Sequence, residues 1–373
     1  MRKSQTSTLI TSAKEKLDEA KGYIHPGQDR PIALVESVQK ILDSLDPSKK
    51  VEDDRKKAAS LMSAVEARYV VDFYYMIQEN RKRAANQAET LSESHQPNNL
   101  ISWLLDSSAA TETQIKNYLD VYSDKHIEGR WAKSITGIGP VIAAGLLAHI
   151  DITQAPTVGH IWRFAGLDPT DTWLGRELAE QLVKDVAGTA RVLTDGHLAE
   201  LALRRGDDLQ VFLEAAKDSE GRITRASVIR AMARRPWNAS LKTLCWKIGE
   251  SFVKFSNLPD CLYGKLYQQR KALEEERNDN GLFKAQAEQK LARVKIGKDT
   301  IAYQHYSKGR LPPAHIHSRA KRWAVKIFLA HYHHVAYEVH FQRPPPKPYV
   351  LEHVPGHHHA IVVPNWPMKK GET

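Results

Sequence analysis

The stretch SITGIGPVIAAGLLAHI, residues 134–150, decides how the middle of this 373-residue chain folds. Two glycines, Gly137 and Gly139, flank one isoleucine, and Pro140 is followed by a run of small and aliphatic residues. A glycine can end a helix in the left-handed conformation, and a proline is well suited to the first turn of the next helix. The spacing therefore predicts two helices joined by a tight turn, a helix-hairpin-helix motif.

Such a turn offers a phosphate group several hydrogen-bond donors. The first backbone N–H groups of the second helix have no partner inside the helix, so a DNA phosphate oxygen can accept their hydrogen bonds. The residues predicted to contact DNA at the turn are Lys133, Thr136, Gly137, Ile138 and Gly139. A corner between two buried helices, with the same glycines and no ligand, remains the alternative. A dinucleotide-binding fingerprint is excluded because Ile142 stands where a third glycine is needed.

Helix patterns dominate the rest of the chain, and no alternating strand series or fixed repeat is found. Residues 53–92 are predicted to form one long helix, with Leu61, Val65, Tyr69, Phe73 and Met76 on one side. The predicted fold class is mainly α, with many helices, a helix-hairpin-helix motif and a proline-rich extended C-terminal tail.

Changes in composition along the chain predict five parts. These are an N-terminal helical domain suited to coiled-coil dimerisation (1–96), a part with the helix-hairpin-helix (97–185), an inserted small helical subdomain (186–235), a basic helical part (236–343) and a proline- and histidine-rich tail (344–373).

Composition excludes several classes of protein. The two cysteines, Cys245 and Cys261, cannot form a disulfide framework or a four-thiolate zinc site. No apolar run has the length of a membrane span, and the first twenty residues are too polar for a signal peptide. These features predict a cytoplasmic protein without membrane contact, associated with the nucleoid if the source is bacterial.

The net charge of +10 is unevenly distributed. Residues 1–220 carry 27 Lys and Arg against 33 Asp and Glu, whereas residues 221–330 carry 23 against 8. A basic excess of this size within one segment favours a polyanionic partner, most simply double-stranded DNA, over a merely solvated basic face. RNA remains open because composition does not distinguish the two polymers.

Basic side chains on and near the predicted helices extend the DNA-binding hypothesis beyond the turn. Thr224 can cap a short helix that carries several arginines, which can each reach a phosphate. Trp237 either stacks on a base or packs in the core. The basic residues predicted to contact DNA are Arg163, Arg222, Arg225, Arg230, Arg234, Arg235, Lys242, Lys247, Arg319, Lys321 and Arg322.

Two blocks together carry a resemblance to a known family. Thr136–Pro140 (TGIGP) and Phe164–Pro169 (FAGLDP) resemble the C-terminal domain of transposases of the insertion-sequence 110 family. The helices around residues 237–252, 263–271 and 320–337 resemble later helices of that domain. The resemblance implies a role in DNA transposition or recombination for a mobile element. Members of that family use a guide RNA, so the resemblance leaves RNA open as a partner.

The sequence also departs from that family. The family's nucleophilic serine is expected just before the glycine that follows the second block, but Leu174 precedes Gly175 here, and Thr172 is the nearest hydroxyl. No acidic nuclease domain is recognised in the N-terminal part. Thr172 is thus the catalytic candidate if the chain is a divergent transposase, recombinase or nuclease, and Mg²⁺ is expected only in that case.

The C-terminal histidines suggest one further chemistry. His331 and His334 are one helical turn apart, so the two rings can share a metal ion such as zinc. No cysteine pair supports such a site, and the sequence favours no cofactor. The leading hypothesis is a transposase-related DNA-binding protein; catalytic activity stays open, with a non-enzymatic role favoured. The alternatives are a divergent enzyme, an oligomeric scaffold joined through the N-terminal helices, and an RNA-binding protein.

Overall fold

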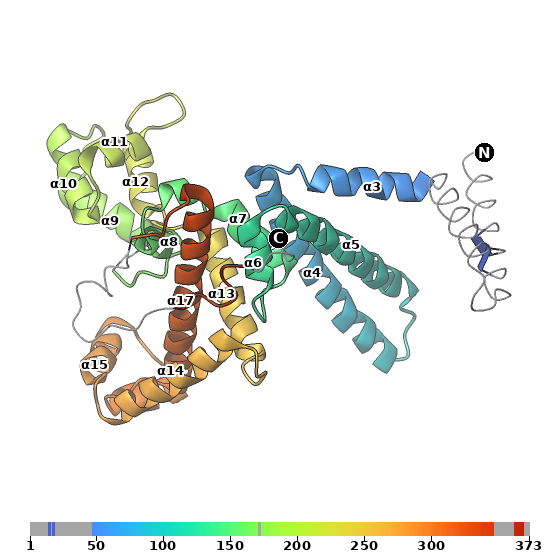
Figure 1. Ribbon diagram of the computed structural model, residues 1–373. Helices are drawn as coiled ribbons and strands as arrows, with labels where there is room; N and C mark the ends of the chain where they lie inside the picture. The colour runs from blue at the N-terminus through green and yellow to red at the C-terminus, as the bar shows by residue number, and fades with distance from the viewer. Residues whose placement is uncertain (1–13, 16, 19–46, 171–172, 347–361, 369–373) are drawn as a thin grey trace. The chain divides into compact units, whose positions relative to one another are not determined.

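The computed structural model describes residues 14–15, 17–18, 47–170, 173–346 and 362–368 (Figure 1). Within these ranges the chain is built from helices, which confirms the predicted mainly α class, and extended backbone pairs only in an isolated antiparallel bridge between Lys217 and Ile223. None of the helices in these ranges is both long and apolar enough to span a membrane. The chain divides into two compact units, Met1–Arg130 and Trp131–Thr373.

The first unit contains three described helices, α3 (Pro47–Ala59), α4 (Ala64–Glu93) and α5 (Asn99–Asp124). The prediction of one helix over residues 53–92 was wrong, because the helix is interrupted between the end of α3 and the start of α4. Ser63 adopts an extended conformation and accepts a hydrogen bond from the backbone N–H of Glu66, which starts a new helix at that point.

Helices α4 and α5 pack as an antiparallel pair through one side of α4. Val71 and Tyr74 are buried on α4, and Leu119 is buried on α5. The predicted apolar stripe lies elsewhere on α4, where Val65 and Tyr69 are both about 70% exposed. The buried face of α4 is instead the one that carries Val71 and Tyr74, and the Tyr74 hydroxyl donates a hydrogen bond to Glu112 on α5.

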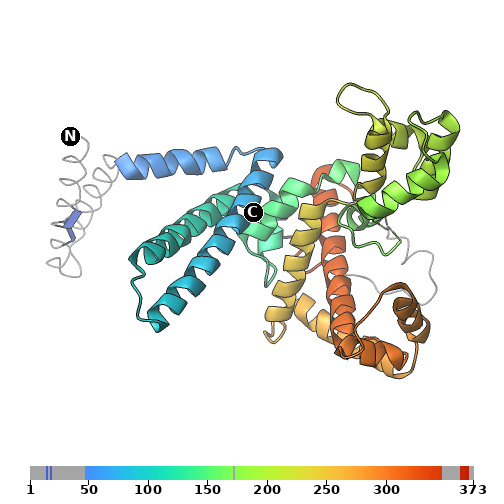
Figure 2. The same cartoon turned by 180° about the vertical axis from the view of Figure 1, so that it is seen from behind.

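The second unit is organised around its longest helix, α17 (Pro313–Phe341), which packs on α13 (Ala239–Lys254), α14 (Leu262–Asp279) and α8 (Val158–Phe164) (Figures 1 and 2). The other helices of this unit, outside the inserted subdomain, are α6 (Ile127–Lys133, which straddles the boundary), α7 (Pro140–His149), η1 (Ile152–Gln154), α15 (Lys284–Arg293) and α16 (Ile301–Ser307).

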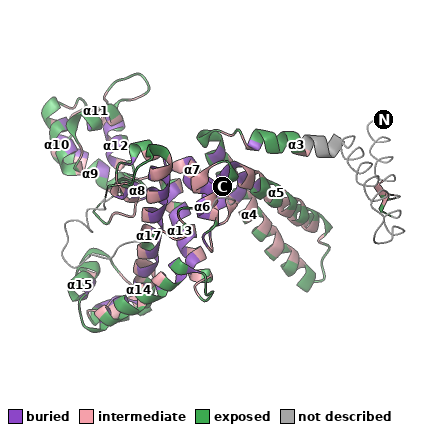
Figure 3. Ribbon diagram, in the orientation of Figure 1, coloured by how far each residue is buried: buried purple, intermediate pink, exposed green. Residues whose placement is uncertain are grey.

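Aromatic rings fill the centre of this unit. Phe328 of α17 stacks on Trp131 with ring centroids 5.9 Å apart, and it meets Phe252 and Tyr263 edge-on. All four side chains are almost completely buried. Figure 3 colours much of α17 purple, as buried. Protein cores are packed so closely that a change of one methylene group disturbs them. This aromatic cluster therefore fixes the positions of α13, α14 and α17 relative to one another.

A small helical subdomain with its own core is inserted between α8 and α13. It consists of α9 (Gly175–Ala187), α10 (Asp195–Arg205), α11 (Leu209–Ala216) and α12 (Arg225–Ala233). Leu201, Phe212 and Val228 are fully buried within it. The predicted insertion starts at residue 186, whereas α9 already contributes Ala179 and Val183 to this core.

The described part of the C-terminal tail, residues 362–368, lies against the second unit. The Trp131 indole donates to the carbonyl of Pro364, Asn365 donates to the carbonyl of Ser134, and the Trp366 indole donates to Glu338 of α17. The remaining residues of the predicted extended tail, 347–361 and 369–373, lie outside the described residues.

Candidate nucleic-acid interface

The glycine-lined turn between α6 and α7 has the backbone geometry that its sequence predicts. Gly137 adopts a φ of +97°, and the backbone N–H of Ile138 donates to the carbonyl of Ile135. Gly139 is the extended N-cap residue of α7, and Pro140 starts the helix. No side chain caps α7.

The two glycines of this turn face different surroundings. A Cβ atom at Gly137 would lie 3.1 Å from the Ser251 hydroxyl and 3.6 Å from Phe252, and the Ser251 hydroxyl donates to the Gly137 carbonyl. A Cβ atom at Gly139 would meet no heavy atom within 4 Å. Gly137 therefore packs the turn against α13, and only the Gly139 side of the turn faces open space.

A second corner, Ala165–Pro169, ends α8 and lies beside the start of α13. Gly166 has a φ of +62°, and a Cβ atom there would lie 2.7 Å from Trp237. The backbone N–H of Asn238 donates to the carbonyl of Phe164, and Asn238 caps α13. The ammonium of Lys242 lies 3.5 Å from the centre of the Trp237 ring. Trp237 is thus held between Gly166 and Lys242.

Asp168 brings one carboxylate to this corner. It accepts hydrogen bonds from the backbone N–H and the hydroxyl of Thr170. The pKa of Asp168 is lowered, first by the backbone hydrogen bond from Thr170 and further by Lys326 and Arg163. The Lys326 ammonium lies 4.3 Å from the centre of the Trp162 ring, and the Trp162 indole donates to the Lys326 carbonyl.

Four cations gather around this corner, and we call them the corner cluster: Arg235, Lys242, Arg322 and Lys326. Burial lowers the pKa of Lys242, and the charges of Arg322 and Arg235 lower it further. Burial likewise lowers the pKa of Lys326, with Arg322 contributing in the same direction and Asp168 opposing it. These side chains lie near enough to repel one another, so the site has a focused positive potential.

The corner cluster has little neutralisation by carboxylates. Among the described residues, no ion pair joins Arg235, Lys242, Arg322 or Lys326 to an Asp or Glu within 4 Å. Arg235 instead lies over the exposed Trp173 ring at 4.7 Å. A cation that is held on an aromatic face keeps its donors for another partner, so the arrangement is suited to receiving an anion.

Other basic residues of α17 serve the fold. Lys321 is buried and pairs with Glu250 of α13. Arg319 donates to the fully buried Glu274 of α14 at 2.8 Å and lies over the Phe283 ring. Each of these two predicted DNA contacts forms an ion pair with a carboxylate of a neighbouring helix, and Glu274 is paired with Arg270 and Arg277 as well. Both side chains therefore have structural roles.

The arginines of the inserted subdomain divide in the same way. Arg225 donates to the carbonyls of Gly188 and Ala190, just after α9, and Arg222 pairs with Asp218 and Glu220. Arg230 and Arg234 instead lie along an open groove beside α12.

Some predicted residues do not join the corner cluster. Lys133 and Thr136 lie at the α6–α7 turn and Lys247 lies half-buried on α13. Thr172, the catalytic candidate, lies outside the described residues.

The two predicted metal ligands face different partners. The Nδ1 atom of buried His331 lies 2.6 Å from the Tyr263 hydroxyl, and the Nε2 atom of His334 lies 3.1 Å from Glu338. In the part of the chain that the structure describes, no three His, Cys, Asp or Glu side chains are grouped to hold a metal ion. Burial lowers the pKa of His331 to about 4.

Sequence reasoning missed Lys326, Asp168 and Trp162 as members of the site. Lys326 follows Arg322 by four residues, so both lie on one face of α17, and this spacing was a usable signal. Nothing in the local sequence indicates that this face meets the α8 corner, because the two segments are more than 150 residues apart.

One of the comparisons with known proteins matches a segment of this chain. No curated protein and no solved structure was found to match the chain. Residues 130–191, which contain the α6–α7 turn and the α8 corner, match the family model described as Transposase IS116/IS110/IS902 family, so this segment of the chain is related to transposases of mobile elements.

Proposed function

We propose that the chain binds double-stranded DNA through the corner cluster, with the open side of the α6–α7 turn as a further phosphate contact. The observation that carries the proposal is the gathering of Arg235, Lys242, Arg322 and Lys326 around one corner, where the Asp168 carboxylate acts on Lys326. Like charges are costly to hold together, and a polyanion is the partner that would relieve this repulsion.

The exposed and half-exposed tryptophans support the same function. Trp173 is 47% exposed and Trp237 is half-buried, and each has a cation on its ring. Interleaved aromatic and basic side chains are typical of surfaces that contact phosphates and nucleotide rings. The match of residues 130–191 to a transposase family adds DNA as the expected polymer.

The salt dependence of binding tests this function. The Arg235→Gln/Lys242→Gln variant removes two cations of the corner cluster, neither of which forms an ion pair with a carboxylate of the described residues. We expect it to weaken binding to a short mixed-sequence DNA duplex about tenfold or more, and to reduce the slope of log affinity against log salt by about 1.8, because each phosphate contact contributes about 0.9. Fluorescence anisotropy over a series of NaCl concentrations measures both quantities.

Matched controls separate local from general charge effects. The Lys271→Gln/Lys290→Gln variant removes a half-exposed lysine of α14, which is paired with Glu275, and an exposed lysine of α15, and it should leave the slope nearly unchanged. Equal losses in the two double variants would show that only net charge matters. Wild-type affinity that does not fall as salt rises would exclude the proposed function, and a clear preference for an RNA duplex would change its polymer.

A further inference from the structure

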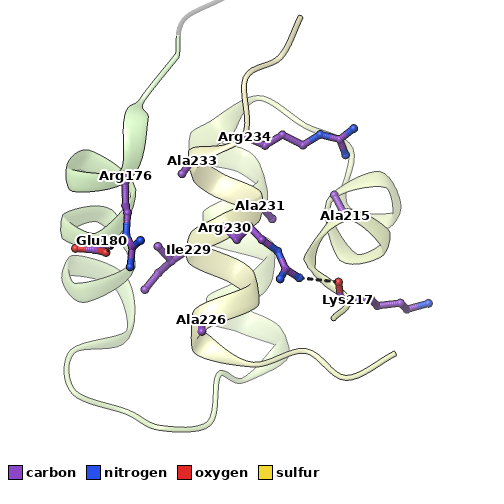
Figure 4. A pocket seen from close by; sticks show the side chains of 10 residues that line it. All are labelled: Arg176, Glu180, Ala215, Lys217, Ala226, Ile229, Arg230, Ala231, Ala233 and Arg234. Carbon is purple, nitrogen blue, oxygen red and sulfur yellow. Dashed lines mark hydrogen bonds and ion pairs between the residues drawn. The ribbon is translucent and has the colours of Figure 1, made fainter. Parts of the chain in front are cut away.

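The inserted subdomain contains a groove that the proposed function does not use. It has a volume of about 780 Å³ and runs across α12 between α9 and the end of α11 (Figure 4). Most of the subdomain, from α10 onward, follows the segment that matches the transposase family, which ends at residue 191. Arg176 and Glu180 of the groove lie within that segment, and the other lining residues follow it.

The floor of the groove is small and apolar. Ala226, Ile229 and Ala233 are spaced by three and four residues, so they share one face of α12. Ala226 is exposed, and Ile229 and Ala233 are half-buried. Short side chains on a helix face let a ligand approach the helix backbone closely. The volume of the groove is in the range of sites that bind small molecules.

Cations stand on both sides of this floor. Figure 4 shows Arg176 on α9 and Arg230 and Arg234 on α12, with Lys217 at the end of α11. Arg176 is held by Glu180 at 2.7 Å, and Lys217 pairs with Glu214. Arg230 donates to the Lys217 carbonyl. Among the described residues, no carboxylate within 4 Å forms an ion pair with Arg230 or Arg234, so these two keep guanidinium donors for a ligand.

An apolar floor between rows of donors matches the chemistry of one nucleic-acid strand. The phosphates carry charge at regular intervals and can accept bidentate hydrogen bonds from arginine, while the sugars present a largely apolar surface. We propose that this groove binds the sugar–phosphate backbone of a single nucleic-acid strand, as a second site separate from the corner cluster. This inference rests on the proposed nucleic-acid-binding function and gives the chain two points of attachment.

The experiment uses the full chain and a mixed-sequence single-stranded DNA oligonucleotide. The Arg230→Gln/Arg234→Gln variant should weaken binding about tenfold and reduce the salt slope by about 1.4, because each contact with a single strand contributes about 0.7. A second variant, Ala226→Glu, places a negative charge in the groove. Ala226 is exposed in the first turn of α12, where a carboxylate favours the helix, so this variant should fold and should also bind more weakly.

The control variant is Arg204→Gln/Arg222→Gln. It removes two arginines from the same subdomain, but each of these is already paired with a carboxylate outside the groove. The proposal predicts an unchanged salt slope for this control. A groove variant and a control with equal slopes would overturn the second site while leaving the corner cluster intact.

Two further outcomes complete the test. Displacement of the oligonucleotide from the groove by AMP at equal phosphate concentration would overturn the assignment in favour of a free nucleotide. A wild-type chain that binds neither the duplex nor the single strand would exclude the proposed function and this inference together. An Arg235→Gln/Lys242→Gln variant that loses duplex binding but still binds the single-stranded oligonucleotide would support a separate site in the groove.

Discussion

The α8 corner and the inserted subdomain are both rich in basic residues, but the two regions use them differently. At the corner, Arg322 and Arg235 lie close enough to Lys242 to lower its pKa. In the subdomain, Arg225 donates to nearby backbone carbonyls, and Arg222 pairs with a nearby carboxylate. The same residue type thus builds a charged site in one region and stabilises local structure in the other.

This difference shows that a basic segment cannot be read as a binding surface from its charge alone. A guanidinium that donates to backbone carbonyls satisfies acceptors at or near a helix end, and it has few donors left for a ligand. A cation over an aromatic ring, such as Lys242 over Trp237, remains available. The partners of each side chain, rather than its charge, therefore separate function from structure.

The largest expected effect tests how tightly the corner is packed. The Gly166→Ala substitution places a Cβ atom 2.7 Å from Trp237 and forces a non-glycine residue to a φ of +62°. The positive φ costs about 1–2 kcal/mol and the overpacking a further 1–3 kcal/mol, so we expect a loss of about 3 kcal/mol in the free energy of unfolding. Urea denaturation followed by tryptophan fluorescence measures this loss.

The matched control is Gly206→Ala in the inserted subdomain. Gly206 has a φ of +79°, but a Cβ atom there meets nothing within 4 Å, so only the conformational cost of about 1 kcal/mol is expected. Similar losses for the two variants would show that Trp237 is not held against Gly166.

The second prediction concerns pH and the core around α17. The pKa of His331 is about 4 in the folded chain because of burial, compared with about 6.5 for an exposed imidazole. Between these values the unfolded chain binds more protons, so stability is fully present above about pH 6.5 and is lost as the pH falls toward 4. The loss from His331 alone is about 3 kcal/mol, and denaturation at a series of pH values measures it.

The His331→Gln substitution should make this pH dependence weaker, since the amide does not titrate and can either donate a hydrogen bond to the Tyr263 hydroxyl or accept one from it. His315, His317 and His333 of the same helix also have pKa values lowered by burial, so part of the dependence should remain. The control is His334→Gln, which changes a half-exposed histidine one turn away. An identical pH profile for the two variants would contradict the prediction.

The smallest of these effects tests the structural role of arginine in the inserted subdomain. The Arg225→Gln substitution removes hydrogen bonds of 2.9 and 3.0 Å to Gly188 and Ala190. Since Arg225 is half-buried, we expect a loss of about 1–2 kcal/mol, without a change in the salt slope of DNA binding. Arg222→Gln breaks the ion pairs of a largely exposed guanidinium with Asp218 and Glu220, so it should cost less than about 0.5 kcal/mol. A weaker salt slope for Arg225→Gln would assign this residue to the interface instead.

Local signals allowed much of the fold to be predicted. The cap at Thr224, the Gly137–Pro140 turn and the helix-period patterns each act within a few residues, so they could be predicted from the sequence. The long helix over residues 53–92 was mispredicted because the apolar spacing continues across the break, while the Ser63 cap that starts α4 is a weaker signal.

The candidate site could be predicted only in part. The α8 corner and several of its cations were identified, but Lys326 and Asp168 were not, and Arg319 and Lys321 were assigned to DNA although they pair with Glu274 and Glu250. Pairing partners on other helices are invisible in a single sequence, since nothing in the spacing of α17 records which face meets α13 or α14.

The sequence by itself determined the mainly α class, the two glycine corners, the excess of positive charge in residues 221–330 and the relation of residues 130–191 to transposases. Only the tertiary structure decided which cations have carboxylate partners, which glycine of the first turn faces open space, and that α8, α13 and α17 meet at one corner. The physical reason is range: caps, turns and periodicity act over one or two helical turns, whereas burial and ion pairing depend on segments that are far apart in the chain.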